Sequence, residues 1–316
     1  MRSLWFLVVA FILACSPLHA GEKVAHRVLV ADYSKRRIAI VDAAGKIEWE
    51  HKIADLHDLH RLPDGNILAQ LSWTRIVEID PRSNKIVWEY DAKKSNGNDK
   101  KPLEVHAFQR LADGVTLIAE SGPARLIEVD RDGKLLRTVK LQVANPRPHT
   151  DTRLVRKLDS GNYLVCHESE GAVREYDATG KVVWDFPVPL FGQKPRGGHG
   201  PEAWGNSVFA ALRLPNGNTL VSTGNGHSVL EVTPKLDIVW HLKQDDLPGI
   251  KLAWVTTLQV LPNGNIVLGN CHAGPDHPQI VEITRDKRVV WTFRDFTHFG
   301  NAVSNSQILD VKGSLR

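Results

Sequence analysis

Cysteine and long apolar stretches are scarce in this sequence, which argues against a disulfide-stabilised fold and against a membrane-spanning protein. Three cysteines occur among 316 residues, and Cys15 lies in the N-terminal leader. Cys166 and Cys271 fall in repeats two apart, so a disulfide between them is doubtful and the chain does not depend on a disulfide framework. Beyond the leader, no run approaches the ~20 apolar residues of a transmembrane helix, so no membrane span is predicted.

A strong charge of either sign is also missing. The formal net charge is +4 at pH 7, and cleavage of a leader that contains Arg2 lowers it to about +3. So small an excess gives no support to a nucleic acid or another polyanion as the partner. No low-complexity tract occurs, and the charged segment Lys93–Lys101 is expected to be a solvated loop.

The first twenty residues have the pattern of a secretory leader. Arg2 precedes the apolar segment Leu4–Ala14, Pro17 breaks a helix, and Leu18-His19-Ala20 is a passable small-residue cleavage site. This predicts a signal peptide over residues 1–20 and a periplasmic or secreted protein over residues 21–316. In an alternative interpretation Ile12-Leu13-Ala14-Cys15 is a lipobox and Cys15 carries a lipid anchor, although Leu13 fits poorly there.

Residues 57–91 contain four short apolar runs, each bounded by turn residues. The runs are rich in β-branched and aromatic side chains, which is typical of strands. Pro63-Asp64-Gly65 supplies a preset φ followed by a residue that tolerates positive φ, as a tight turn requires. The segment is therefore predicted to be a four-stranded antiparallel meander.

The same unit recurs along the whole chain. The leucine that ends its first strand returns every 47 to 56 residues, at Leu62, Leu111, Leu158, Leu214, Leu261 and Leu309. The fourth strand carries a tryptophan in five units, at Trp49, Trp88, Trp184, Trp240 and Trp291, with Arg137 in the remaining one. A period near 50 with four strands per unit predicts an all-β, six-bladed β-propeller in one domain. A repeated aromatic of this kind is expected to pack between blades.

Both ends of the chain contribute to one blade. Residues 27–53 supply only strands two, three and four of a unit, and residues 302–312 supply only strand one. Together they complete the sixth blade, and this pairing of terminal strands removes the exposed edges that an open array would have.

Histidine is concentrated at one predicted face of the ring. Loops that enter the first strand of a blade, and loops that join its second and third strands, share one face. Thirteen histidines lie outside the leader, and none is expected at the opposite face, which carries the glycine turns. Because the histidines gather on one side, we expect the first face to be the functional one. The nine histidines predicted there are His57, His106, His149, His167, His199, His227, His272, His277 and His298.

The repeat register sorts further candidates around the channel mouth. Five residues before each repeated leucine stand His57, His106, Arg153, Phe209, Thr256 and Ser304, and seven before it stand Asp55, Glu104, Asp151, Ser207, Trp254 and Ala302. Positions two apart share a side of a strand, so half of the mouth is charged and the other half is aromatic. This suits a small ligand with an anionic group and a flat ring. Alternatively, the acid–base pairs are structural links between blades.

One long connection and one mixed segment complete the candidates. Residues 186–207 form the only long link between blades, and Arg196, His199 and Trp204 in it could belong to a lid or binding loop rather than a passive surface loop. Residues 270–277 mix metal-ligand types, but their spacing matches no compact zinc site, so no metal site is predicted.

The repeat resembles the PQQ-type, or quinoprotein-like, propeller superfamily. The segment from Asp177 to Trp184 (DATGKVVW) has its blade-ending pattern, and the segments 57–68 and 214–220 resemble the repeats of bacterial arylsulfate sulfotransferases. That family has a six-bladed periplasmic propeller in which a channel histidine carries the sulfuryl group. PQQ dehydrogenases are usually larger and eight-bladed, so no bound PQQ or other cofactor is expected.

Two function classes remain open. The first is a non-catalytic propeller that binds a small molecule or a protein. The second is an arylsulfotransferase-like enzyme. There the resemblance implies a catalytic role for His57, and the blade register adds His106 and Arg153. Phe209 and Trp254 would then offer a flat surface to the aryl leaving group.

Overall fold

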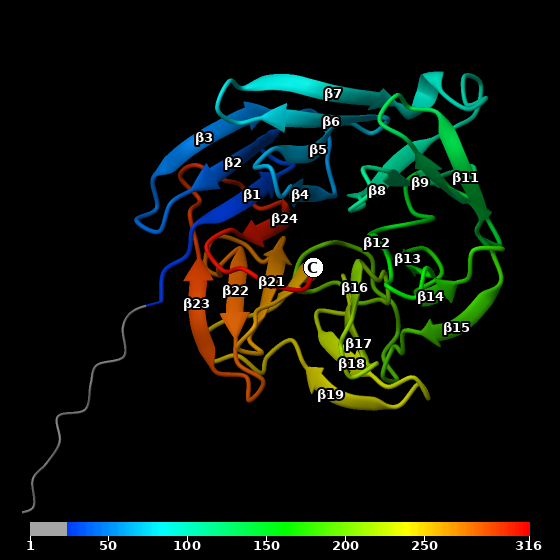
Figure 1. Ribbon diagram of the computed structural model, residues 1–316. Coiled ribbons are helices and arrows are strands. Elements are labelled where there is room, and N and C mark those ends of the chain that lie inside the picture. The colour runs from blue at the N-terminus through cyan, green and yellow to red at the C-terminus, as the bar shows by residue number, and fades with distance from the viewer. Residues whose placement is uncertain (1–23) are drawn as a thin grey trace, which may run out of the picture.

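The computed structural model describes residues 24–316 as a ring of six four-stranded antiparallel sheets around a central channel (Figure 1). The predicted leader and the alternative lipid anchor at Cys15 lie outside the described residues. The first blade consists of β24 (Val303–Ile308), β1 (Val28–Asp32), β2 (Arg37–Val41) and β3 (Ile47–Lys52), in that order from the channel outward. The six-bladed propeller predicted from the repeat is thereby confirmed.

The other five blades follow in chain order. Blade two has β4 (Leu59–Arg61), β5 (Ile67–Ser72), β6 (Arg75–Asp80) and β7 (Lys85–Asp91), and blade three has β8 (Glu104–Arg110), β9 (Thr116–Ser121), β10 (Arg125–Val129) and β11 (Leu135–Lys140). Blade four has β12 (Val155–Lys157), β13 (Tyr163–His167), β14 (Ala172–Tyr176) and β15 (Val182–Pro187). Blade five has β16 (Ala210–Arg213), β17 (Thr219–Ser222), β18 (Val229–Val232) and β19 (Ile238–Leu242), and blade six has β20 (Trp254–Val260), β21 (Ile266–Cys271), β22 (Ile280–Ile283) and β23 (Val289–Phe293).

The two ends of the chain close the ring, as the sequence predicts. β1 pairs with β2 on one side and with β24 on the other, so that Val30 lies opposite both Ala39 and Ser306. Figure 1 shows the red C-terminal strand beside the blue N-terminal one, at the channel. The first blade thereby has four strands like the other five, although its strands come from both ends of the chain.

Burial explains why the strands differ in composition from the channel outward. All five residues of β1 are buried, because apolar side chains on both faces pack against the neighbouring blades. The outermost strand β3 instead alternates between half-buried and exposed positions. Each large apolar cluster joins two adjacent blades; one, for example, joins Leu29 and Ile38 of blade one to Leu59 and Ile67 of blade two. A blade that cannot bury both faces alone is stabilised by its neighbours.

A repeated polar brace crosses the junctions between blades near the glycine turns. In blade two, Glu78 accepts hydrogen bonds from Asn66 at 2.8 Å and from Arg110 of the next blade at 3.1 Å. The Arg110 guanidinium lies 4.4 Å from the ring centre of Trp88. The repeated tryptophans are half-buried on the outer strands, and this one lies under the cation of the next blade, as expected for an interblade role.

Two further features bear on the sequence predictions. Within residues 24–316 the only helix is the short 3-10 turn η1 (Ala92–Lys94), and no helix there is long and apolar enough to cross a membrane. Cys166 and Cys271 are both buried and unpaired.

Candidate functional site

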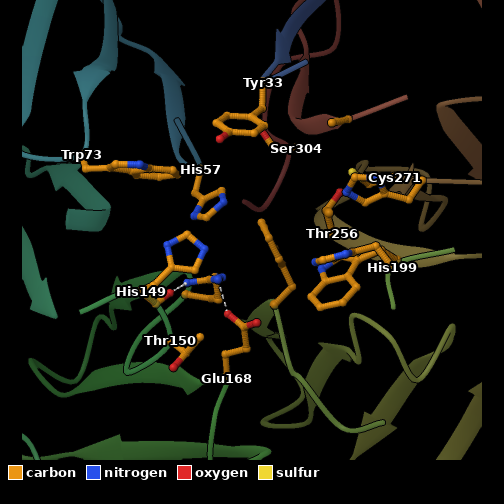
Figure 2. Close-up of a pocket in the computed structure, with 15 residues that line it drawn as sticks. Tyr33, His57, Trp73, His149, Thr150, Glu168, His199, Thr256, Cys271 and Ser304 are labelled. Atoms are coloured by element: carbon orange, nitrogen blue, oxygen red, sulfur yellow. Dashed lines mark hydrogen bonds and ion pairs between the residues drawn. The ribbon is translucent and has the colours of Figure 1, made fainter. Parts of the chain in front are cut away.

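A cavity of about 410 Å³ opens at the end of the channel where the histidines gather (Figure 2). All six blades or the connections between them contribute to its wall. The lining residues include Tyr33, His57, Trp73, His149, Arg153, Glu168, His199, Phe209, Trp254, Thr256, His272 and Ser304. A concave site of this size, with aromatic walls and a few polar groups, is typical of a small-molecule site.

The blade register places its candidates together. Five of the six residues that stand five positions before the repeated leucines line the cavity: His57, Arg153, Phe209, Thr256 and Ser304. His106, the sixth, lies fully buried behind His57, with 2.8 Å between their two Nδ1 atoms. The strand register of β8 shifts between Val105 and Ala107, and such a bulge re-aims the side chain that it contains.

A chain of hydrogen bonds fixes the orientation of His57. The Nε2 of His106 faces two acceptors, the Pro148 carbonyl at 3.1 Å and the Glu104 carboxylate at 3.2 Å, so we assign its proton to this nitrogen. Neutral His106 must then accept at Nδ1, and the Nδ1 of His57 is the donor. The Nε2 of His57 is left with a free lone pair.

Burial keeps this pair of histidines uncharged. Burial and, after it, the positive charge of Arg153 lower the pKa of His106 to about 3, although Glu104 acts in the opposite direction. The pKa of His57 is also held well below its usual value by burial, Arg153 and the neighbouring histidines. At neutral pH both rings are therefore neutral, and the lone pair on His57 is available.

The charged half of the mouth is paired differently from the expectation. Arg153 forms its ion pair with Glu168, and it also donates to the His149 carbonyl. Asp151 instead accepts hydrogen bonds from the backbone nitrogens of Gly122 and Arg147 and braces a turn. The buried Arg153–Glu168 pair leaves little uncompensated positive charge in the cavity.

Of the three predicted acid–base pairs, one is present among residues 24–316. Glu104 bonds both His106 and His149, and these contacts, against the cost of burial, lower its pKa to about 2. Asp55 makes no hydrogen bond to His57 in this part of the chain, and its pKa is raised by burial. The prediction that each acid contacts the base two residues away is wrong for Asp55 and Asp151, because the loops turn these two side chains away from the predicted bases.

Four aromatic rings form walls around the cavity. Phe209 and Trp254 lie there as the register predicts, and Tyr33 and Trp73 were missed. Trp73 packs at 4.8 Å from His57, measured between ring centres. Tyr33 directly follows β1 and Trp73 directly follows β5, so both stand in loops that join second and third strands. Loops at these positions are the ones in which histidines are predicted at this face, so the same rule places Tyr33 and Trp73 at the cavity.

The long connection contributes one of its three candidates to the cavity. His199 lines the wall and packs on Trp254, with 4.8 Å between ring centres. Arg196 is exposed and Trp204 donates its indole N–H to the Leu190 carbonyl at 3.3 Å; neither lines the cavity. The backbones of Arg196 and Trp204 pair with each other, so these two residues shape the loop that presents His199.

The histidines of this face have unlike surroundings. Four line the cavity, namely His57, His149, His199 and His272, and a fifth, His106, lies behind His57. His167 and His227 are buried and bonded to backbone carbonyls, while His277 lies near the Lys251 backbone and His298 is exposed. The opposite face is not free of histidine: buried His26 contacts Glu282 at 2.8 Å and Asp310 at 3.1 Å, because the segment before β1 folds under blade six.

Buried polar side chains fill the channel beneath the cavity. Asp58 and Arg156 form a buried pair with two contacts of 2.8 and 3.0 Å. Arg316 enters from the other end and bonds His60 at 3.1 Å and Asn305 at 2.6 Å. We refer to these five residues as the channel floor.

Comparisons with known proteins agree with the repeat. The family described as "Outer membrane protein assembly factor BamB" matches residues 34–293. Quinohemoprotein alcohol dehydrogenase ADH IIB of Pseudomonas putida is 27% identical over 185 residues, which cover 52% of this chain and 26% of that protein. This chain thus spans about a quarter of the length of that relative. The family match confirms the PQQ-type resemblance, and the finer resemblance to arylsulfate sulfotransferases stays a prediction.

Solved structures show the same fold. A protein of unknown function from Bacteroides caccae superimposes with a TM-score of 0.73 at 24% identity, over 89% of this chain and 97% of that one. A virginiamycin B lyase from Staphylococcus aureus gives a TM-score of 0.54 at 12% identity, over 92% and 87% of the two chains. At these identities the likeness concerns the fold alone.

Proposed function

The chain belongs to the propeller family of outer membrane protein assembly factor BamB, and from that premise we propose that it is a binding propeller whose cavity takes one small aromatic or heteroaromatic molecule. The observation that carries this is the cavity wall: four aromatic rings from four blades enclose about 410 Å³ together with neutral histidines. The family description and the secretory pattern of the leader support a place in the periplasm. The small concave site favours a small molecule over a protein as the occupant.

The charges of the cavity favour a neutral ring. Among the charged side chains, Arg153 has the largest effect on the pKa of His57 and of His106, and its buried pairing with Glu168 offsets its attraction for an anion. Binding would then rest on stacking against Trp254 and Phe209 and on a hydrogen bond to the free Nε2 of His57. The anionic aromatic ligand expected from the sequence is the less favoured form in this cavity.

PQQ does not fit this donor set. PQQ is a tricyclic quinone with three carboxylates and needs several uncompensated cations or N–H donors. The cavity offers one guanidinium already bound to Glu168, and the buried histidines His57 and His106 are neutral. We therefore assign no quinone chemistry to this site.

Titration with a neutral and an anionic probe of the same ring tests the proposal. We expect 2-naphthol to bind the full chain saturably and more tightly than 2-naphthyl sulfate, as measured by calorimetry and by the shift in melting temperature. Trp254→Ala should weaken binding at least tenfold because it removes a stacking wall. The matched control Trp240→Ala, on an outer strand, should bind like the wild type. Equal effects of the two changes, or no saturable binding at millimolar probe, would contradict the proposal.

A second candidate, sulfuryl transfer, is favoured by one observation. The contacts from Glu104 through His106 leave a lone pair on the Nε2 of His57, as a nucleophile requires. In that reaction this nitrogen attacks the sulfur of an aryl sulfate, the S–O bond to the aryl group breaks, and the phenolate leaves. A phenolic acceptor then takes the sulfuryl group from the histidine and loses its own proton.

Turnover separates the two candidates. If sulfuryl transfer is correct, the full chain releases 2-naphthol from 2-naphthyl sulfate when phenol is present. His57→Ala then lowers the rate by orders of magnitude, and the control His298→Ala, an exposed histidine that does not line the cavity, changes it little. Binding of 2-naphthol without any release from the sulfate ester would leave the binding propeller as the function and exclude this candidate.

A further inference from the structure

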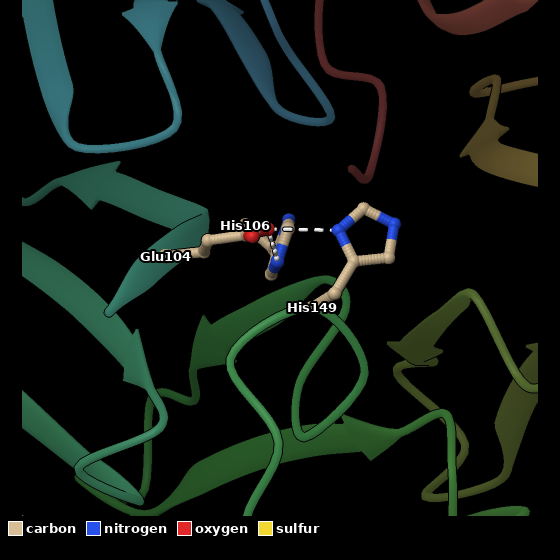
Figure 3. A group of neighbouring side chains, drawn as sticks. All are labelled: Glu104, His106 and His149. Atoms are coloured by element: carbon tan, nitrogen blue, oxygen red, sulfur yellow. Dashed lines mark hydrogen bonds and ion pairs between the residues drawn. The ribbon is translucent and has the colours of Figure 1, made fainter. Parts of the chain in front are cut away.

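Glu104, His106 and His149 place three metal-ligand atoms at one point on the edge of the cavity (Figure 3). The Glu104 Oε2 lies 3.2 Å from the His106 Nε2 and 2.8 Å from the His149 Nδ1, and all three atoms lie within 4.8 Å of one another. They come from the start of β8 and from the connection between β11 and β12. The sequence predicted no metal site, because no short motif contains these three residues.

We propose that these three side chains bind one divalent transition-metal ion, with Zn²⁺ as the reference case. Two imidazoles and one carboxylate are ligands that zinc and its neighbours accept, whereas calcium and magnesium prefer sites made of oxygen. The ion would take the place of the hydrogen bonds that now join Glu104 to the two rings. His149 is 56% exposed and lies in a loop, so it can adjust to the bonds of about 2.1 Å that the ion requires.

The surroundings resemble those of bound metals in two respects. His106 has a partner on its other nitrogen, since its Nδ1 contacts the Nδ1 of His57 at 2.8 Å, and such partners orient a metal-bound imidazole. Trp73 covers one side, with its ring centre 5.1 Å from that of His106 and 5.4 Å from that of His149. An apolar plate of this kind limits the access of water to the ion.

Nearby charges favour a cation. Asp55 lies close enough to Glu104 and His149 to interact electrostatically with both. Together with Glu168 and the ligand Glu104 itself, this gives three carboxylates, against the two guanidinium groups of Arg153 and Arg36. The Pro148 carbonyl, 3.1 Å from the His106 Nε2, would face the ion as a further oxygen. The remaining coordination positions point toward the cavity, because His149 lines its wall.

Metal binding would reverse the proton arrangement at His57. The ion needs the lone pair on the His106 Nε2, so the ring proton moves to the His106 Nδ1. That nitrogen then donates to the Nδ1 of His57, and the proton of His57 moves to its Nε2. No proton is lost from either ring, but the nitrogen that faces a ligand changes from an acceptor to a donor. The metal would thus alter which hydrogen-bonding groups the cavity recognises.

Titration of the full chain, purified without a histidine tag and stripped with EDTA, tests the proposal. We expect one Zn²⁺ per chain by calorimetry, a rise in melting temperature with added Zn²⁺, and a visible absorption band with Co²⁺. Glu104→Gln and His149→Ala should each weaken Zn²⁺ binding at least tenfold and abolish the Co²⁺ band. The matched control His199→Ala, an exposed histidine on the opposite wall, should bind Zn²⁺ within twofold of the wild type.

Three results would overturn the site: no saturable binding of one ion, undiminished binding in Glu104→Gln and His149→Ala, or an equal loss in His199→Ala. The substituted side chains are at most partly buried, and far-ultraviolet circular dichroism checks that the variants fold. Binding of 2-naphthol is measured separately in EDTA, so failure of the metal site and failure of the proposed ligand site can be told apart.

Discussion

The two faces of the ring are built from the same repeated unit but differ in how far its residues recur from blade to blade. Near the glycine turns, blade after blade uses one arrangement: a third-strand glutamate meets a cation from the end of the next blade's inner strand. The pairs Glu78–Arg110, Glu128–Lys157 and Glu175–Arg213 have contacts of 3.1, 2.6 and 2.7 Å. At the other face, the equivalent inner-strand position holds four kinds of side chain in the six blades: two histidines, an arginine, a phenylalanine and two hydroxyl residues.

This difference follows from what each face must do. Each junction packs the same two surfaces of neighbouring blades together, so the same residue types can stabilise every junction and recur along the chain. Where the cation is missing, a substitute appears: Val260 stands at that position in blade six, and Arg285 reaches Glu231 instead. The channel mouth is a single site assembled from six positions, and identical residues there would give a ring of like groups. The internal repeats therefore diverge at the face where we propose that a ligand binds.

Removing the closing strand should have the largest effect, because it breaks both faces at once. Deletion of residues 302–316 takes β24 away from β1 and removes Asn305, which donates to the His57 carbonyl at 3.0 Å and to Asp58 at 3.3 Å. We expect the deleted chain to lose cooperative thermal unfolding in circular dichroism. Deletion of residues 313–316 alone should lower the melting temperature much less. A full deletion that melts within a degree or two of the intact chain would show that closure is unimportant.

Acid should destabilise the histidine face and the channel floor beneath it by several kcal/mol and should spare the glycine-turn face. Burial lowers the pKa of four histidines to about 4 (His60, His167, His272) or about 3 (His106). The unfolded chain binds these protons near pH 6.5 and the folded chain does not, so stability is lost as pH falls from about 6.5 to 4, by ~1.4 kcal/mol per proton per pH unit. Urea unfolding at pH 7 and pH 5 measures the loss, and His167→Gln should reduce its slope.

His26 at the glycine-turn face should respond to pH with the opposite sign. Burial would lower its pKa, but hydrogen bonds to Glu282 and Asp310 outweigh this and raise it. Its contribution is therefore complete below pH 6.5 and lost as pH rises through the folded value. His26→Gln should cost more stability at pH 5.5 than at pH 9. An equal cost at both values would remove this contrast between the faces.

The smallest expected effect concerns the braces themselves. Trp240 is half-buried under the Arg285 guanidinium, 4.6 Å from its ring centre, and donates to the Arg285 carbonyl at 2.8 Å. Trp240→Ala should cost ~1–3 kcal/mol, less than a fully buried aromatic. The matched change Val239→Ala, 56% exposed on the same strand, should cost under ~0.5 kcal/mol. Similar costs in urea unfolding would show that the brace adds nothing.

Much of the fold can be predicted from the sequence because it rests on periodicity. The repeated leucines fix the blade boundaries, and each directly follows an inner strand, as Leu62 follows β4 and Leu214 follows β16. The same register brings His57, Arg153 and Phe209 to one cavity. Equivalent positions in regular strands occupy equivalent places in every blade, so counting residues from the repeated leucine is enough to predict which side chains meet.

The partners of these residues could not be predicted because they lie in loops or beside a bulge. Glu168 follows the second strand of its blade and bonds Arg153 only through the path of that turn. His149 joins Glu104 from a loop that matches no repeat position. His106 turns behind His57 where the strand register shifts. Conformation at such places depends on tertiary contacts that a residue count does not contain.

The channel floor has a consequence for kinetics. Among residues 24–316, Asp58 and Arg156 fill the channel below the cavity and Arg316 occupies its far end, so this part of the chain leaves the cavity a single mouth. A molecule that enters the cavity must leave by the same opening, so no ligand can pass through the channel from one face of the ring to the other. If the cavity holds one molecule at a time, a group-transfer reaction here must leave the group on the protein and release the first product before the second substrate binds, and double-reciprocal plots then give parallel lines. A pure binding protein would instead show simple competition among all its ligands.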